Sequence, residues 1–353
     1  MLFRLIRFLP QPFKTKDYGM KKLLASVCLL ALLIPSAALS ANYKVRLGHS
    51  DKPADDSIIH ITALHFKELA EKYSDGKLEV VIYPANQLGD QVDQVRSLQT
   101  GAQEMTQGSV NNFANFAPPL NYLTLPYMLT GVEDARATLD AMWDKHNEWL
   151  TQLGGVRALV WTDAGFRNLT TKNRPVRTLA DLQGMKVRLP NNPISLSAFK
   201  AFGVNPIPMG WGELFSALQQ GVVDSQENCY SAVLTEHFDE VQKYATDIEW
   251  QYTISLFIAS EAWFKSLPAD MQEALVKAGK ETTAWQRATM DKMEADIVAE
   301  LKKRGMEFVG KPTDYDEWVK RGRSTWEEQY KTIGGGDAAK GKAIVDEIMA
   351  AKK

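Results

Sequence analysis

The sequence predicts an α/β protein made of two lobes. Its 353 residues suffice for two domains of ordinary size. Hydrophobic residues make up 45% and charged residues 24% of the chain, which is typical of globular proteins. Short apolar runs alternate with longer amphipathic ones, as in strands layered against helices. The net charge of −2 leaves no basic excess that would favour binding to nucleic acid.

The first 40 residues have the layout of an export signal that precedes the folded part. A second methionine is followed by two lysines and by the 12-residue apolar run 23–34. That run is shorter than the roughly 20 residues of a membrane-spanning helix. Small residues then occupy the −3 and −1 positions of a cleavage site that ends at Ser40. We therefore expect a signal peptide over 20–40, cleaved near Ser40, and a mis-assigned start or extension over 1–19.

Cleavage there would change the charge and the cysteine content. The remaining chain would hold 35 basic and 42 acidic residues, a net charge of −7, and one cysteine, Cys229. One cysteine cannot form an internal disulfide. An acidic protein attracts anions poorly from a distance, so any bound anion must be held by local groups.

Strands and helices alternate through the first half of the remaining chain. Apolar runs predict strands over 43–48 and 77–83, and a one-sided apolar face predicts a helix over 58–73. The other elements expected in this half are a helix at 91–98, a strand end at 105–108, a helical region at 132–153 and a strand at 156–162.

A second cycle of strands and helices follows. Its expected elements are strands at 186–189, 205–208, 222–225 and 252–260, and helices at 194–202 and 213–220. The pattern at 269–304 contains no proline and predicts a helix of about 54 Å, at 1.5 Å per residue. A helix of that length exceeds one small domain, so it must break or span two. The charge-rich tail 337–353 is predicted as a solvated helix.

The two cycles predict the domain boundaries. We expect one lobe to contain 41–164 and about 254–290, and the other to contain 165–253 and about 291–353. The strand at 252–260 and the long helix would return the chain from the second lobe to the first. Ligand sites usually lie at domain interfaces, so the cleft between the lobes is the expected site.

Motifs of catalysis and metal binding are absent from the sequence. There is no HExxH, CxxC, GxSxG or phosphate-binding glycine loop. His60 and His65 should point about 140° apart on the predicted helix, His60 toward solvent and His65 at the core edge, so they cannot share a metal ion. Cys229 and His237 could act as nucleophile and base, but nothing brings them together, and an inert buried thiol is the alternative. We predict no cofactor and no metal site.

Two arginines lie in surroundings that surface arginines rarely have. Arg188 lies within the apolar strand 186–189, and Arg167 follows the strand 156–162. A guanidinium can hold a carboxylate through two parallel hydrogen bonds, and this pair strengthens where water is excluded. The alternative is a structural ion pair with an acid such as Glu227, which is itself a candidate for the site.

Further candidates are polar or aromatic residues in loops. Asn228 has an amide that both donates and accepts hydrogen bonds, and Trp211, between two glycines, can form the wall of a pocket. A capping role for Asn228 and core packing for Trp211 remain open. Polar loops that follow strands of the first lobe add His49, Asp51 and Asn112, with turn chemistry as the alternative.

Several linked motifs resemble one protein family. The runs 81–90 (VIYPANQLGD), 123–127 (LTLPY) and 179–228 resemble the extracytoplasmic solute receptors of tripartite ATP-independent periplasmic (TRAP) transporters. The resemblance covers nearly all of the chain after Ser40. It implies a two-lobed periplasmic-binding-protein (Venus-flytrap) fold with a long helix, here 269–304, spanning both lobes. It also implies a periplasmic protein that captures a small organic anion and delivers it to a TRAP membrane permease driven by ion gradients.

The same resemblance assigns roles to individual residues. Arg188, in KVRLP, matches the arginine that binds the ligand carboxylate, and Arg167 matches an arginine that assists it. Trp211, in PMGWGE, matches an aromatic residue of the pocket wall, and Asn228, in QEN, matches a residue that contacts the ligand. Asp224-Ser225 stands where the family more commonly has Asp-Gly, and Cys229 where it frequently has proline, so the exact ligand is open. C4-dicarboxylates, sugar acids, 2-oxo acids, other carboxylates and sulfonates all remain candidates.

Two other functions remain open at this point. An exported enzyme acting on a small organic acid could use the same cleft, with Cys229, Glu227 or Asp224 as its nucleophile or base. A ligand-sensing receptor could instead feed a signalling kinase. Turnover of an acid by the purified protein would favour the enzyme, and a neighbouring gene for a sensor kinase would favour the receptor.

Overall fold

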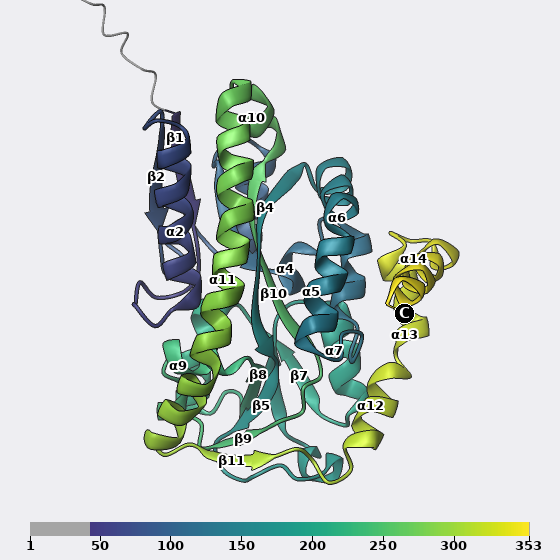
Figure 1. Ribbon diagram of the computed structural model, residues 1–353. Coiled ribbons are helices and arrows are strands. Elements are labelled where there is room, and N and C mark those ends of the chain that lie inside the picture. Colours follow the sequence, from purple (N-terminus) through teal and green to yellow (C-terminus); the bar gives the residue numbers. More distant parts are fainter. Residues whose placement is uncertain (1–42, 353) are drawn as a thin grey trace, which may run out of the picture. The chain divides into compact units, whose positions relative to one another are not determined.

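The structure is a computed structural model that describes residues 43–352. The predicted extension 1–19 and signal peptide 20–40 lie outside the described residues. Two β-sheets with helices packed on their faces make up the described part (Figure 1). None of the helices in 43–352 is long and apolar enough to cross a membrane.

The first sheet is mixed, with the order β2-β1-β3-β10-β4. Strand β1 runs parallel to β2 and β3, whereas β10 runs antiparallel to β3 and β4. Side chains alternate along β10, so Leu256 and Ile258 enter one hydrophobic core while Phe257 and Ala259 enter another. Its strands are β1 (Tyr43–Gly48), β2 (Leu78–Tyr83), β3 (Met105–Ser109), β4 (Val156–Phe166) and β10 (Tyr252–Ser260).

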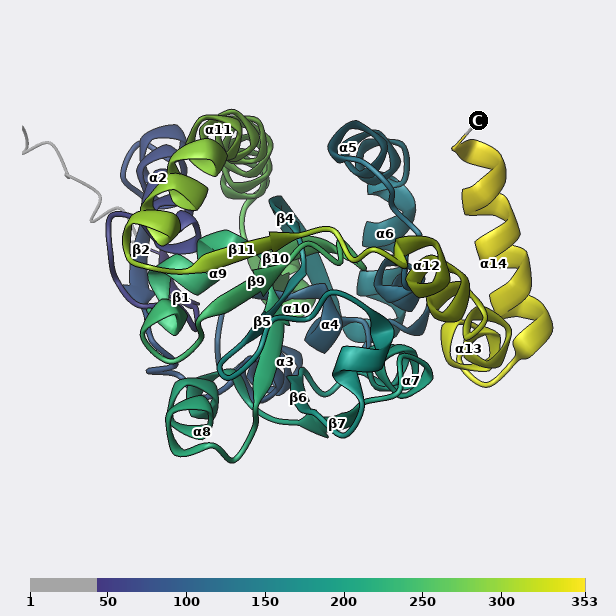
Figure 2. The same ribbon diagram turned by 90° about the horizontal axis from the view of Figure 1, so that it is seen from below.

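The second sheet has the order β11-β9-β5-β8-β6-β7. Helices α7 and α12 supply Phe199 and Trp318 to a core that also holds Val187 of β6. Its strands are β5 (Asn168–Thr171), β6 (Lys186–Leu189), β7 (Asn205–Pro208), β8 (Ser225–Asn228), β9 (Tyr244–Thr246) and β11 (Glu307–Gly310). In the view from below, β11 runs from the foot of α11 toward α12 (Figure 2).

The helices and short turns between these strands have the following bounds. The longer helices are α2 (Ile58–Tyr73), α3 (Gln91–Gln99), α5 (Val132–Ala141), α6 (Trp143–Trp149), α7 (Pro193–Ala201), α8 (Leu214–Gln220), α11 (Ala269–Lys303), α12 (Tyr315–Arg323), α13 (Trp326–Ile333) and α14 (Ala338–Ala351). The shorter ones are α4 (Val110–Phe113), α9 (Tyr230–Thr235), α10 (Glu261–Ser266), η2 (Pro118–Thr124), η3 (Leu150–Gly154), η4 (Leu179–Leu182), η5 (Trp211–Glu213) and η6 (Phe238–Glu240).

The chain passes between the two sheets three times. It crosses at Arg167, between β4 and β5, then between β9 and β10, and finally along the 35-residue helix α11. The first half of α11 packs Leu275 against the first sheet, and its second half packs Leu301 into a core with β9 (Figure 1). A Cβ atom on Gly279 would lie 2.1 Å from the carbonyl oxygen of Leu159, so only glycine allows α11 to approach β4 this closely. The predicted two-lobed α/β fold with a long helix across both lobes is confirmed.

The last two helices pack differently from the expectation. Ile333 of α13 and Ile344 and Ile348 of α14 share a core with Leu120 of η2 and Leu139 of α5, next to the first sheet. The prediction of a solvated tail helix is therefore wrong for the face of α14 that carries these side chains. The lobe boundaries stay a prediction, but these contacts favour placing 326–351 with the first sheet rather than the second.

Most predicted elements agree with the structure, and the differences have local causes. The helix 58–73 and the strands 43–48, 186–189, 205–208 and 252–260 are confirmed to the residue. The strand predicted at 222–225 starts only at Ser225, because Gly221 (φ 73°) ends α8 and begins a turn. The helical region 132–153 is divided into α5, α6 and the π-turn η3.

Candidate ligand-binding site

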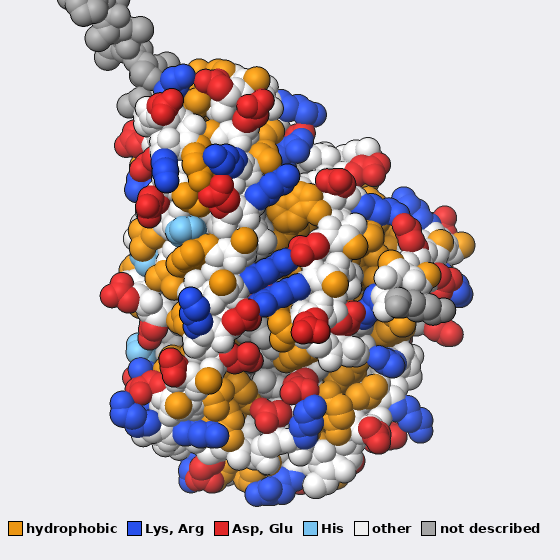
Figure 3. All heavy atoms as spheres, viewed as in Figure 1, with side chains coloured by type: hydrophobic (Ala, Val, Ile, Leu, Met, Phe, Trp, Pro, Cys, Tyr) orange, Lys and Arg blue, Asp and Glu red, His pale blue; other side chains and the backbone are white. Residues whose placement is uncertain are grey.

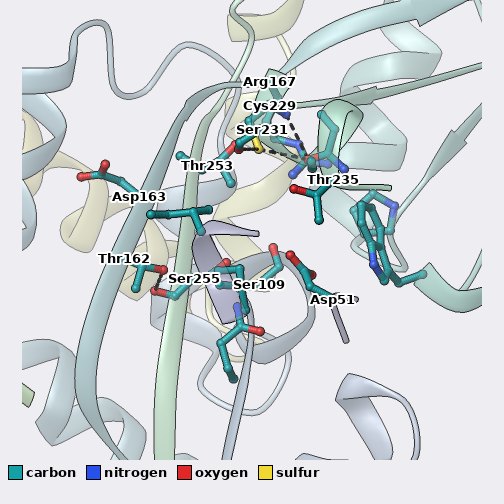
Figure 4. A pocket seen from close by; sticks show the side chains of 18 of the residues that line it. Asp51, Ser109, Thr162, Asp163, Arg167, Cys229, Ser231, Thr235, Thr253 and Ser255 are labelled. Carbon is teal, nitrogen blue, oxygen red and sulfur yellow. Dashed lines mark hydrogen bonds between the residues drawn. The ribbon is translucent and has the colours of Figure 1, made fainter. Parts of the chain in front are cut away.

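A cavity of about 730 Å³, open solvent at its mouth included, is lined by residues of both sheets (Figure 4). The first sheet and its loops contribute Asp51, Gln107, Ser109, Asn112, Thr253 and Ser255, together with Thr162 and Asp163 of β4. The second sheet and its loops contribute Arg188, Trp211, Asn228 and Cys229, with Arg167 at the crossing. Residues of both sheets thus line one concave site, and small-molecule sites are often found at such interfaces.

Arg188 is a buried cation without an acidic partner. Its side chain leaves β6 and the residue is 3% exposed, yet none of the described carboxylates lies within ion-pair distance of the guanidinium. Its Nε and Nη2 donate to the carbonyl oxygen of Met209 at 3.1 and 2.7 Å. Burial lowers the pKa of Arg188 to about 10, and the like charge of Arg167 acts in the same direction. An anion in the cavity would supply the missing charge partner.

Arg167 has the partner that Arg188 lacks. Its Nε and Nη2 donate to Glu227 Oε2 and Oε1 at 2.5 and 2.8 Å, and Nη2 also donates to the carbonyl oxygen of Glu227 at 2.9 Å. Glu227 is fully buried and also accepts from Trp250 Nε1 at 2.7 Å. This is the structural ion pair that the sequence left open as the alternative. Its Coulombic attraction and hydrogen bonds keep the pKa of Arg167 above its usual value despite burial.

Two of the eight predicted site residues do not line the cavity. Successive side chains of a strand point to opposite faces, so Asn228 faces the cavity while Glu227 turns toward Arg167. His49 is buried, with Nε2 3.1 Å from Nδ1 of His60, and burial together with His60 lowers its pKa to about 4. The expectation that His60 faces solvent is thus wrong, because its ring packs against His49 and is half-buried.

The remaining predicted residues do line the cavity. The Asn228 Oδ1 accepts from the backbone N–H of Cys229 at 3.0 Å, a local contact that leaves the Nδ2 for other partners. It does not cap α9, whose N-cap is Cys229 and has no side-chain cap hydrogen bond. The half-buried Trp211 lies with its ring centroid 5.7 Å from Arg188 Cζ and packs edge-on against Phe238. Asn112 donates to Gln91 Oε1 at 2.9 Å.

Asp51 is the acidic member of this set. It lies in the loop between β1 and α2, and its Oδ2 accepts a 3.4 Å hydrogen bond from the hydroxyl of Ser57. Burial and the neighbouring charge of Glu236 raise the pKa of Asp51 to about 7. The other acid of the wall, Asp163, is held by Arg136 at 2.8 and 3.1 Å.

Sequence reasoning missed most of the neutral polar side chains in the wall. The hydroxyls of Thr253 and Ser255 lie on one face of β10, in the same alternation that buries Phe257 further along. The Oγ1 of Thr253 and the Oε1 of Gln107 are buried and have no hydrogen bond within 43–352. Two polar residues at alternate positions of an otherwise apolar strand are the sequence signal that could have found them.

The arrangement offers little to an enzyme. The Sγ of Cys229 has polar contacts with Asn228 Oδ1 at 3.7 Å and Ser231 Oγ at 3.3 Å, whereas the His237 ring lies 3.4 Å from Arg304 Nη1. The nucleophile and base weighed from the sequence are thus engaged with different neighbours. Over 43–352 no three His, Cys, Asp or Glu side chains are grouped as metal ligands.

Comparison with known proteins shows which family the chain resembles. The family model described as bacterial extracellular solute-binding protein, family 7 (DctP), matches residues 49–332. A TRAP periplasmic solute-binding protein from Rhodobacter sphaeroides is 38% identical, with a TM-score of 0.73 over 88% of this chain and 100% of that one. The sugar acid binding protein DctPAm from Advenella mimigardefordensis strain DPN7T, solved in complex with galactonate, is 31% identical, with a TM-score of 0.80 over 88% of this chain and 99% of that one.

A further relative is also a periplasmic binding protein. The 2,3-diketo-L-gulonate-binding periplasmic protein YiaO of Escherichia coli (strain K12) is 30% identical over 281 residues, which cover 80% of this chain and 84% of that protein. The resemblance drawn from the motifs at 81–90, 123–127 and 179–228 is therefore confirmed, and the chain belongs to the bacterial extracellular solute-binding protein family 7.

Proposed function

We propose that this protein binds a small organic acid in the cavity between its two sheets and delivers it to a TRAP-type membrane permease. The observation that carries this proposal is the buried guanidinium of Arg188, which has no acidic partner within 43–352. A carboxylate ligand would accept two parallel hydrogen bonds from it and neutralise its charge. The relatives support the same chemistry, because galactonate and 2,3-diketo-L-gulonate are both carboxylates.

The surrounding residues support a binding role for the whole cavity. In this account Arg167, held in place by Glu227, and the amide of Asn228 donate further hydrogen bonds to the acid. Trp211 covers it from the side of η5. A ligand that touches residues of both sheets binds the closed arrangement better than an open one, and this differential affinity shifts the population toward the closed form.

The family supports a place of action and a partner for this protein. Related proteins are named as periplasmic binding proteins, and the predicted signal peptide 20–40 is consistent with export to the periplasm. Named members belong to TRAP systems, which supports a membrane permease as the receiver of the ligand. A small organic acid and the permease are thus the two partners that we assign.

The proposal is tested by screening organic acids against the purified protein by thermal unfolding, followed by calorimetric titration of each hit. A ligand at about 100 times its dissociation constant should stabilise the fold by about 2.7 kcal/mol. Arg188→Gln should lose the hits, whereas the control Arg321→Gln, at an exposed arginine of α12, should keep them. A protein that no organic acid stabilises, or whose hits survive Arg188→Gln, would contradict the proposal.

The enzyme alternative is tested in the same samples. Each acid that binds is incubated with the protein and recovered for mass analysis. Unchanged acid is the expected result, and turnover that disappears in a Cys229→Ala variant would favour the enzyme instead.

A further inference from the structure

The charges that face the cavity are only partly compensated. Arg167 is neutralised by Glu227, and Asp163 is neutralised by Arg136. Two charged groups of the wall remain, the guanidinium of Arg188 and the carboxyl group of Asp51. The charges that act on Arg188 are those of Glu227, Arg167 and Glu213, whereas Glu236 acts on Asp51, so the two groups do not compensate each other.

Asp51 lies where no cation neutralises it within 43–352. The nearest basic side chain in sequence, Lys52, is directed to Glu236, with 3.6 Å between Nζ and Oε2. Glu236 lies across the cleft at the end of α9 and repels Asp51, and the buried imidazole of His49 is paired with His60. The only side chain that donates a hydrogen bond to Asp51 among the described residues is Ser57. Asp51 therefore keeps acceptor capacity directed to the cavity it lines (Figure 4).

Neutral polar groups line the wall near these two charged groups. The hydroxyls of Ser109, Thr235 and Thr253 and the amide of Gln107 all line the cavity. Two of their oxygens, Thr253 Oγ1 and Gln107 Oε1, have no partner within 43–352. Buried polar atoms are normally hydrogen-bonded, so these oxygens require donors on the ligand, as Asp51 does.

We propose that Asp51 selects the ligand of this cavity, by accepting a hydrogen bond from a hydroxyl group remote from the ligand's carboxylate and by rejecting a second carboxylate there. The ligand is then a polyhydroxylated monocarboxylate and not a dicarboxylate. The inference rests on the proposed function, because it assumes that the ligand's carboxylate lies at Arg188.

The physical reason is a difference in charge at one end of the ligand. A hydroxyl gives Asp51 a charge-assisted hydrogen bond, which is stronger than a neutral one. A carboxylate at the same place would face the carboxylate of Asp51, and like charges across an interface are costly. A hydroxyl also suits the neighbouring serine and threonine side chains, since each can donate or accept as needed.

The test compares acids that differ only at the far end. Three matched pairs serve: D-gluconate with D-glucarate, D-galactonate with galactarate, and D-erythronate with meso-tartrate. Each pair replaces a terminal hydroxymethyl group by a carboxylate. Dissociation constants are measured by calorimetry at pH 8.5, above the pKa of about 7 of Asp51, so that its carboxylate is ionised. The monocarboxylate of at least one pair should bind, at least about tenfold tighter than its dicarboxylate partner.

Asp51→Asn makes the comparison specific to one residue. It keeps the size of the side chain and removes its charge. The preference, which is the dissociation constant of the dicarboxylate divided by that of its monocarboxylate partner, should therefore fall at least about tenfold. Asp144→Asn is the matched control, because it removes the same charge from an exposed side chain of α6 outside the cavity, and the preference should stay as in the wild type. If Asp51→Asn does not fold, the preference of Asp51→Ser is compared with that of the wild type instead.

The outcomes separate this inference from the proposed function. A dicarboxylate that binds as tightly as its monocarboxylate partner overturns the role of Asp51. If Arg188→Gln no longer binds that dicarboxylate, the proposed function still stands. An unchanged preference in Asp51→Asn overturns the inference as well. Tighter binding of 6-aminohexanoate than of any aldonate would assign Asp51 to an ammonium group and reject the hydroxyl. If neither acid of any pair binds, but other acids bind and lose their affinity in Arg188→Gln, the polyhydroxylated class of ligand is rejected and the proposed function is retained.

Discussion

The two walls of the cavity differ in how they carry charge. The second-sheet wall, with the crossing at Arg167, places two guanidinium groups near one buried acid, Glu227, so one positive charge is left for a ligand. The first-sheet wall carries Asp51, the neutralised Asp163 and a set of hydroxyl and amide groups. This difference supports the proposal that the second-sheet wall binds the ligand's carboxylate and that the first-sheet wall contacts the rest of the ligand.

The face of the molecule seen in Figure 3 has no comparable asymmetry of charge, because basic and acidic side chains are interspersed there. A single-sign field that would steer an anion from a distance is not present on this face. In the proposed function, attraction of an anion therefore depends on the local charge of Arg188, and the following predictions test each wall separately.

The largest expected effect is on stability, at Glu227. Glu227→Gln leaves Arg167 as a second uncompensated buried cation, so the free energy of unfolding should fall by about 3–5 kcal/mol. Urea denaturation measures the loss. Glu213→Gln, at an exposed acid near Arg188, is the control and should change stability by no more than about 0.5 kcal/mol. Equal effects of the two variants would mean that the Arg167–Glu227 pair is not structural.

The next effect is on binding, at Arg188. Arg188→Lys keeps a positive charge but loses the planar fork, so the free energy of binding should weaken by about 1.5–3 kcal/mol, the size of one charge-assisted hydrogen bond. The free energy of unfolding should change little, because lysine is likewise a buried cation and its ammonium can donate to the carbonyl oxygen of Met209 in place of the guanidinium. Calorimetric titration and urea denaturation of the same variant separate the two effects. A stable variant with wild-type affinity would show that this wall does not hold the acid group.

A smaller effect is expected on the first-sheet wall. Thr253→Val removes an unpaired buried hydroxyl at nearly constant volume, so a hydroxylated ligand should bind weaker by about 1 kcal/mol. Thr282→Val is the matched control, because Thr282 on α11 also carries a buried hydroxyl without a partner in 43–352 but does not line the cavity. Titration with the same acid should give the wild-type affinity for this control. If both variants weaken binding alike, the hydroxyl of Thr253 has no specific contact with the ligand.

The smallest effect is a pH dependence of stability that Asp51 imposes. The pKa of Asp51 is near 3.8 in the unfolded chain and about 7 in the folded one, so the folded protein binds the additional proton between these values. Its contribution to stability is present at low pH and is lost as the pH rises through about 7. The difference in unfolding free energy between wild type and Asp51→Asn should therefore fall with rising pH, by on the order of 1 kcal/mol after allowance for solvent. A difference independent of pH from 4 to 8 would contradict this.

The sequence was a better guide to the second-sheet wall than to the first. The apolar strand around Arg188 and the family motifs both predicted that residue, and the structure places it at the cavity with no carboxylate of 43–352 within ion-pair distance. The role of Glu227 could not be settled in advance, because only the alternation along β8 decides that it faces Arg167 while Asn228 faces the cavity.

The residues of the first-sheet wall could not be predicted, because their exposure to the cavity depends on tertiary packing that the sequence does not show. Polar residues such as Thr253 and Ser255 resemble the solvent-facing half of an ordinary strand, and they become a ligand wall because β10 lies between β3 and β4 with both faces covered. His49 does not line the cavity, because its ring turns toward His60 on α2. The buried face of α14 likewise exists only because α5 and η2, distant in sequence, lie against it.

The most direct test of the division between the walls is a crystal structure of the protein with the tightest-binding aldonate. Both carboxylate oxygens should lie within about 3.2 Å of the guanidinium nitrogens of Arg188, and hydroxyls of the ligand should donate to Asp51 and Thr253. A carboxylate held elsewhere, with Arg188 still donating only to the carbonyl oxygen of Met209, would contradict this division.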